Sequence, residues 1–194
     1  MTTPTDPRAG NRSRNRWMLI ALFAMFFGAM FVAGILRFSG WRPQGMKNKG
    51  ELLQPYADLR TLTPRLADGS EYHWNPAART WRIAAMPRDC TNAAASQCEA
   101  LLRQLDTVWQ LAGKDADRVD LLWIGDLPAG GTRPASLRQV QPDMALRDRL
   151  PDGDAVTGTP VYVIDPNGFV VLRYAPGFDP AGLRTDLSRL LKLK

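Results

Sequence analysis

Cys90 and Cys98 carry the two thiol groups of this chain, and they are its most reactive side chains. Thiols form disulfides, exchange them with partner proteins, or bind soft metal ions as thiolates. Seven residues, TNAAASQ, separate the pair within a chain of 194 residues. The chemistry of the protein therefore depends on what this pair does.

Three interpretations stay open, beside that of two unrelated free thiols. A structural disulfide needs Cα atoms about 4.4–6.8 Å apart, which a loop of this length can reach, and it would contribute roughly 2–3 kcal/mol. A redox-active pair would use Cys98 as a thiolate, favoured by Arg88 and by the first turn of a helix, with Cys90 resolving the mixed disulfide. Two thiolates could also bind Cu(I), completed by Met86 or His73.

A strand and a helix must position the pair. The run TWRIAAM, residues 80–86, is typical of a buried strand that Pro87 ends. Ser96 and Glu99 have the spacing of a capping box and predict that the helix starts there. Its expected apolar face is formed by Leu101, Leu105, Val108, Trp109 and Ala112, and Gly113 would stop it. The apolar run 118–124 predicts a second buried strand, parallel to the first.

The remaining segments complete an α/β scaffold. A turn at 67–70 predicts a hairpin within residues 51–75, and the segment 136–150 predicts short helical pieces broken at Pro142. Strands at 160–164 and 169–174 flank Asp-Pro-Asn-Gly and form a predicted hairpin. Asp179 and Pro180 predict the start of a last helix, whose apolar face is Leu183, Leu187, Leu190 and Leu191.

The order strand, helix, strand, helix, hairpin, helix is that of a thioredoxin-like fold, a central mixed sheet flanked by helices. The segment TGTPVYVIDPNGFVVLRY, residues 157–174, resembles the corresponding segment of membrane-tethered thioredoxin-like proteins. The cysteine positions are similar to those of thioredoxin-like and Sco-type proteins, the latter being anchored copper chaperones for cytochrome c oxidase assembly. The resemblance covers roughly residues 60–194. It implies that Pro160 is a cis proline lying against the cysteines, so Cys90, Cys98 and Pro160 are the candidate catalytic residues.

Two departures from these families concern the metal. Thioredoxins have two residues between their cysteines and Sco-type proteins have three, whereas this chain has seven. Sco-type proteins also use a histidine shortly before the final hairpin as a third copper ligand, and the matching stretch DGDAVTGTP has none. The single histidine, His73, is expected to be a partly exposed polar residue. Copper on Cys90 and Cys98 therefore remains one candidate among several.

The N-terminal part predicts a membrane anchor. Residues 17–36 carry no charge over 20 positions, enough for a helix to cross a bilayer core of about 30 Å. Residues 1–16 are expected to form a disordered basic cytoplasmic tail, residues 37–55 a linker, and residues 56–194 the thioredoxin-like domain. Basic residues flank the span on both sides, so the inside N-terminus rests on the short tail and on the cysteine pair, which suits an oxidising compartment.

These features favour an accessory protein of the bacterial inner membrane whose domain faces the periplasm. The resemblance implies support of cytochrome c oxidase assembly, through copper handling or contacts with respiratory oxidase subunits. An anchored thiol–disulfide oxidoreductase and a redox-silent interaction module are the alternatives. Nucleic acid is not expected as a partner, because the net charge of +6 comes from basic residues interleaved with acidic ones.

Overall fold

A computed structural model describes residues 9–38, 47–91, 94–129, 133–153 and 158–193. The chain divides into an N-terminal unit, Met1–Met46, and a domain, Lys47–Lys194. The domain holds the sheet and both hydrophobic clusters, so it contains its own core.

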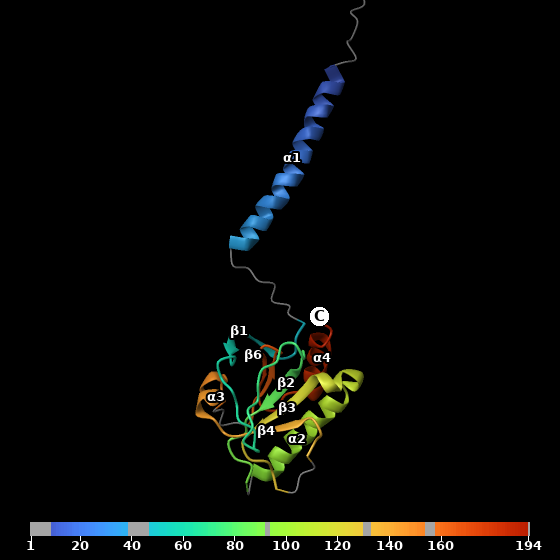
Figure 1. Ribbon diagram of the computed structural model, residues 1–194. Coiled ribbons are helices and arrows are strands. Elements are labelled where there is room, and N and C mark those ends of the chain that lie inside the picture. The colour runs from blue at the N-terminus through green and yellow to red at the C-terminus, as the bar shows by residue number, and fades with distance from the viewer. Residues whose placement is uncertain (1–8, 39–46, 92–93, 130–132, 154–157, 194) are drawn as a thin grey trace, which may run out of the picture. The chain divides into compact units, whose positions relative to one another are not determined.

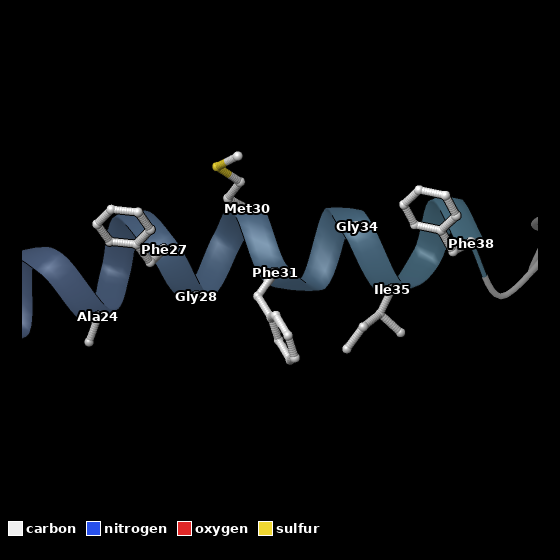
Figure 2. A pocket seen from close by; sticks show the side chains of 8 residues that line it. All are labelled: Ala24, Phe27, Gly28, Met30, Phe31, Gly34, Ile35 and Phe38. Atoms are coloured by element: carbon white, nitrogen blue, oxygen red, sulfur yellow. The ribbon is translucent and has the colours of Figure 1, made fainter.

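The N-terminal unit contains the helix α1, Ala9–Phe38. Within it, Arg14–Phe38 is long and apolar enough to cross a membrane, and these 25 residues are unburied. Figure 2 shows apolar side chains on opposite sides of α1, with Phe27 and Met30 on one side and Phe31 and Ile35 on the other. A helix that is apolar all round suits a lipid environment.

Helix α1 also corrects the expected tail. The disorder expected of residues 1–16 is wrong for residues 9–16, which continue the apolar helix by two turns. Once a helix is nucleated, extending it through Arg- and Ser-containing sequence costs little. The polar residues 9–16 therefore adopt the helical conformation of the apolar run that comes after them. Residues 1–8 lie outside the described residues.

The domain is built on a six-stranded mixed sheet of order β1-β6-β5-β2-β3-β4. The strands β2 and β3 are parallel, as are β3 and β4, whereas β5 pairs antiparallel with β2 and β6, and β1 antiparallel with β6. This confirms the predicted parallel strand pair and the C-terminal hairpin. The bounds are β1 Glu51–Asp58, β2 Trp81–Ala85, β3 Val119–Ile124, β4 Leu137–Val140, β5 Val161–Ile164 and β6 Phe169–Tyr174.

Helices cover both faces of the sheet, as Figure 1 shows with α2 and α4 on one side and α3 on the other. Alternate residues of each central strand point to opposite faces, so Ile83 belongs to one hydrophobic cluster and Ala84 to the other. The helices are α2 Ala95–Gln110, α3 Met144–Arg149 and α4 Pro180–Leu190, with a 3₁₀ helix η2 at Gly113–Arg118. This arrangement is the expected thioredoxin-like fold.

Two strands lie where other structure was expected. Strand β1 starts at Glu51, so the linker expected to run to residue 55 is wrong for its last five residues. Strand β4 replaces the first helical piece expected before Pro142, because Leu137 pairs with Leu121 of β3 and sheet pairing overrides local propensity. The second piece is α3. The predicted hairpin around residues 67–70 is a tight turn closed by one bridge, Arg65 to Glu71.

Candidate functional site

Cys90 and Cys98 form a disulfide in the structure, with their Cα atoms 5.6 Å apart. Both residues belong to the hydrophobic cluster beneath α2 and α4. Their exposed fractions are 3% and 5%, so a partner thiolate cannot reach either sulfur without opening of the surrounding structure. The disulfide interpretation is confirmed as a bond, whereas its role as staple or redox site is still a prediction.

Strand β2 and helix α2 hold the two cysteines in place. Cys90 lies in the loop after β2, and Cys98 is the fourth residue of α2, within the first turn expected for it. The loop is fixed by Asp89, whose Oδ1 accepts hydrogen bonds from the backbone N and the hydroxyl of Thr91. The sulfur of Cys98 faces this loop, since its Sγ lies 3.5 Å from the carbonyl oxygen of Asp89.

The start of α2 differs from the predicted capping box. The N-cap is Ala94, no side chain caps the helix, and Ser96 lies inside the first turn. The turn that precedes the helix is instead made by Thr91, whose carbonyl accepts from the Ala94 amide. The Asp89–Thr91 pair is the local sequence pattern that could have predicted this turn. An Asp side chain that accepts a hydrogen bond from the backbone two residues later is a recognised turn motif.

The loop that holds Cys90 carries both a basic and an acidic residue, Arg88 and Asp89. The hydrogen bonds from the Thr91 side chain and backbone lower the pKa of Asp89, which therefore stays ionised at neutral pH. The basic Arg88, expected to favour a thiolate, precedes this carboxylate directly. A neighbouring anion opposes thiolate formation, so the loop does not present the uniformly electropositive surroundings of a reactive cysteine.

Pro160 lies at the end of the sheet from which the cysteine loop leaves. Val161 pairs with Ala85, so antiparallel register puts Pro160 beside the end of β2. Pro160 is buried, but its peptide bond with Thr159 is not cis: among the described residues the cis bond is Gln54–Pro55. The expected cis proline is wrong, and a catalytic role of Pro160 is still a prediction.

The additional copper ligands considered for the pair do not converge on it. Met86 belongs to the cluster on the opposite face of the sheet, where its Cε packs at Gly153. The His73 side chain is 69% exposed and lies 3.4 Å from Glu71. Within the described part of the chain no three His, Cys, Asp or Glu residues are grouped as a metal site. The donor set therefore does not fit a three-ligand copper centre.

Two buried polar networks in the domain were not predicted from the sequence. Arg82 of β2 is 2% exposed and donates from Nε to the hydroxyl of Tyr72, which donates in turn to Asp120. Burial raises the pKa of Tyr72 to about 12. A lone Arg in an apolar strand is the signal that would have found this network, since a buried cation needs partners.

The second network joins the start of the domain to α4. Asp186 is 2% exposed, and its Oδ2 accepts from the amides of Lys49 and Gly50 and from the Tyr174 hydroxyl. Burial and this carboxylate raise the pKa of Tyr174, so its hydroxyl stays protonated and keeps donating.

A mixed sheet with a cysteine pair between a central strand and the next helix defines a thioredoxin-like protein. The chain belongs to the family of transmembrane-like, thioredoxin-like C-terminal domains, whose model matches residues 81–194, more than half of its length. A search of curated proteins found no sequence match.

The solved structure of one Sco protein shares the fold, and two further solved structures are similar to the chain at lower TM-scores. BsSco, from a study of a disulfide switch in a member of the Sco family of cytochrome c oxidase assembly proteins, is 12% identical, with a TM-score of 0.52 over 75% of this chain and 98% of that one. Copper-bound ScoI of Bradyrhizobium japonicum is 18% identical, with a TM-score of 0.46 over 66% and 96%. The exposed lipoprotein thioredoxin Etrx1 of Streptococcus pneumoniae is 14% identical, with a TM-score of 0.46 over 66% and 98%.

Proposed function

We propose that this chain is an anchored accessory protein of the bacterial inner membrane that supports cytochrome c oxidase assembly through protein contacts. The observation that carries the proposal is a buried Cys90–Cys98 disulfide in a thioredoxin-like domain, in a chain whose N-terminal helix is long and apolar enough to cross a membrane. BsSco, with the same fold, is a member of a family of oxidase assembly proteins. A disulfide persists in the periplasm and not in the cytoplasm, which supports a periplasmic domain.

Protein contacts are favoured over copper delivery because of the donor set. In the structure the two sulfurs are bonded to each other, and neither Met86 nor His73 lies with them. Reduction would be required before any Cu(I) could bind, and the site would then offer two thiolates. Copper titration of the reduced chain tests this directly. Stoichiometric Cu(I) binding that disappears in Cys98→Ser would restore the copper interpretation.

Deletion of the gene in its native host tests the role in assembly. We expect less oxidase activity and less assembled oxidase in the membrane, restored by the wild-type chain but not by added copper. Restoration by copper alone would indicate metal delivery, and unchanged oxidase levels would refute the assembly role. Cross-linking of the complementing chain in membranes should capture oxidase subunits.

Topology has its own test. A phosphatase or a fluorescent protein that works on one side of the membrane, fused after Lys194, reports the location of the domain. Phosphatase activity is expected outside the cytoplasm. Fluorescence of the cytoplasm-specific reporter would overturn the periplasmic assignment and, with it, the compartment in which the disulfide would persist.

A thiol–disulfide oxidoreductase is the second candidate function. It is favoured by one observation, the position of Cys98 in the first turn of α2, where backbone amides stabilise a thiolate. Equilibration in defined glutathione buffers measures the potential of the pair. A disulfide that stays oxidised at the most reducing glutathione ratios would exclude exchange with ordinary redox partners and leave a stabilising bond.

A further inference from the structure

We propose that one face of the domain docks on anionic phospholipid headgroups of the membrane that α1 spans. This basic face comprises α4, the residues before β1 and the adjoining end of η2. The inference rests on the proposed function in so far as α1 must be embedded in a bilayer. The basic residues of the face are Lys47, Lys49, Arg118, Arg184, Arg189 and Lys192.

Specific contacts assemble these residues around α4. Arg189 donates to the carbonyl of Lys47, and Arg118 donates to the carbonyl of Leu191 at 3.0 Å. Lys49 packs over Gly182, since a Cβ placed on that glycine would lie 3.0 Å from the Lys49 Cβ. Segments that are far apart in the sequence thus bring their cations to one helix.

A hollow of about 300 Å³ between α2 and α4 lies within this face. Arg184 and Lys192 line it together with the hydroxyl-bearing Thr185 and Ser188. The two cations suit a phosphodiester, because Arg and Lys side chains donate charge-assisted hydrogen bonds to phosphate oxygens. The Thr185 and Ser188 hydroxyls donate to the carbonyls of Ala181 and Thr185 and add polar surface to the hollow.

Exposed leucines accompany the cations. Leu111, which lines the hollow, is 53% exposed, and Leu193, next to Lys192, is 63% exposed. Such side chains contact the acyl region just below lipid headgroups, where burial of apolar area adds to attraction between opposite charges. The combination of cations and exposed leucines is typical of a membrane-binding surface.

Acidic residues do not cancel the charge. Asp115 lines the same hollow, and its carboxylate lies 3.8 Å from Arg118. Asp186 is buried and lies 3.2 Å from Arg189, and Asp179 accepts from the first amides of α4. Two more acidic residues lie at the edges of the face, Asp117 beside Arg118 and Glu51 in a hollow that Lys49 also lines. Six basic residues therefore face five acidic ones, of which Asp186 is withdrawn from the surface.

The covalent chain favours the membrane as the occupant of this face. Eight residues, 39–46, link α1 to Lys47, and a chain of that length reaches at most roughly 30 Å. Lys47 is itself part of the basic face, so this face contains the point at which the connection from α1 enters the domain. A basic residue at an anionic surface raises partitioning roughly fivefold, and the effect is lost beyond a Debye length of about 8 Å.

The test uses the full chain in lipid nanodiscs. Because both native cysteines are in a disulfide, a spin label on Leu193→Cys attaches at one position. We expect the label to be shielded from a water-soluble nickel reagent in discs containing phosphatidylglycerol and exposed in discs of phosphatidylcholine alone. High salt should abolish the difference.

Charge reversal provides the matched comparison. Arg184→Glu with Lys192→Glu should lower the docked-to-free ratio roughly 30-fold or more, as two fivefold contributions are removed. Arg65→Glu with Arg79→Glu changes the net charge equally at exposed positions of the segment before β2, outside the basic face, and should leave docking unchanged. All four side chains are exposed, so both variants are expected to keep the wild-type unfolding midpoint.

Two outcomes overturn the proposal. A control distinguishes a failure of docking from a failure of α1 to insert into the bilayer. Equal accessibility of position 193 in both lipids, or equal losses in the two double variants, refutes docking by this face. A second label on Met30→Cys, a 67% exposed position of α1, must be accessible to oxygen dissolved in the lipid. If that label is accessible to the nickel reagent, α1 is not embedded, and the anchored function fails together with the docking.

Discussion

The guanidinium of Arg82 links strand β2 to the segment just before it and to the distant β5–β6 turn. From strand β2 it donates to the Tyr72 hydroxyl and to the carbonyls of Asp165 and Pro166, and it lies 5.3 Å from the ring centroid of Trp74. The segment before β2 is thereby held against the β5–β6 turn. Because Arg82 itself is buried, the loss of one partner leaves part of its guanidinium unsatisfied.

Tyr72 gives this network a pH dependence. The fold raises its pKa to about 12 from an ordinary value of 10.0, so the folded state favours the neutral phenol. This contribution is present in full below about pH 10 and is lost as the pH rises toward 12. Urea unfolding between pH 8 and pH 11 should show a steeper loss of stability in the wild type than in Tyr72→Phe. The variant should also lose about 1–2 kcal/mol at pH 8.

The exposed Tyr56 supplies the control, because Tyr56→Phe removes a phenol that is 48% exposed. Its pH profile should match that of the wild type. A Tyr72→Phe profile as steep as the wild-type one would show that the ionisation of Tyr72 is not coupled to folding.

At the scale of elements, two residues before or at the start of α2 have sequence patterns typical of a turn or a cap. They are Asp89 and Ser96, and only Asp89 makes the expected hydrogen bonds. Asp89→Ala should weaken the cysteine loop, because the Asp89 carboxylate accepts from the backbone and hydroxyl of Thr91. Ser96→Ala should change stability by less than about 0.5 kcal/mol, since Ser96 caps nothing. Thermal unfolding midpoints of the two variants show which substitution costs more stability. A larger loss in Ser96→Ala would mean that the capping box forms after all.

Closure of the loop by the disulfide should stabilise the same region. The bond spans a sequence separation of 8 residues, and removing it in Cys90→Ala with Cys98→Ala should cost roughly 2–3 kcal/mol. Reductant should lower the urea midpoint of the wild type toward that of the double variant and leave the variant unchanged. A wild-type midpoint that does not move after verified reduction would refute a stabilising role.

Elements with strong local signals were predictable from the sequence. Asp179 caps α4, and Asp165 closes the β5–β6 turn by accepting from the amides of Asn167, Gly168 and Phe169. Strand β1 was missed because it is an edge strand with mixed exposure, interrupted by Pro55, so its residues do not alternate between polar and apolar. Strand β4 was missed because it exists through pairing with β3.

The candidate site was predictable in position and not in chemistry. Spacing and helix periodicity located Cys98 in the first turn of α2. Leu102 is buried in addition to the expected apolar face, and Leu101 packs partly buried against the same cluster. Whether a cysteine pair reacts depends on burial and on neighbouring charge, which arise from the packing of α2 and α4 on the sheet. Such long-range packing leaves no local pattern in the sequence from which the reactivity of the cysteines could be predicted.

For the whole molecule, the start of the domain is set by Lys49 and Gly50 rather than by β1. A fragment of residues 47–194 should unfold at the midpoint of the full chain, because the domain contains its own core. A fragment of residues 51–194 lacks two backbone amides that bond Asp186 and should lose about 2 kcal/mol or more. Calorimetry compares the unfolding midpoints of the two fragments. Identical midpoints would show that the Asp186 contacts do not stabilise the domain.

The Asp186 network also determines how the domain bears mechanical load. Any pull on the chain ahead of Lys47 enters the domain at Lys47–Gly50, and there it acts on hydrogen bonds to α4 before it acts on β1. In the sheet, β6 and β5 lie between β1 and β2, the strand that leads to the cysteines. Load at this point is therefore carried first by α4, the helix that ends the chain, and α4 packs against α2, the helix that holds Cys98.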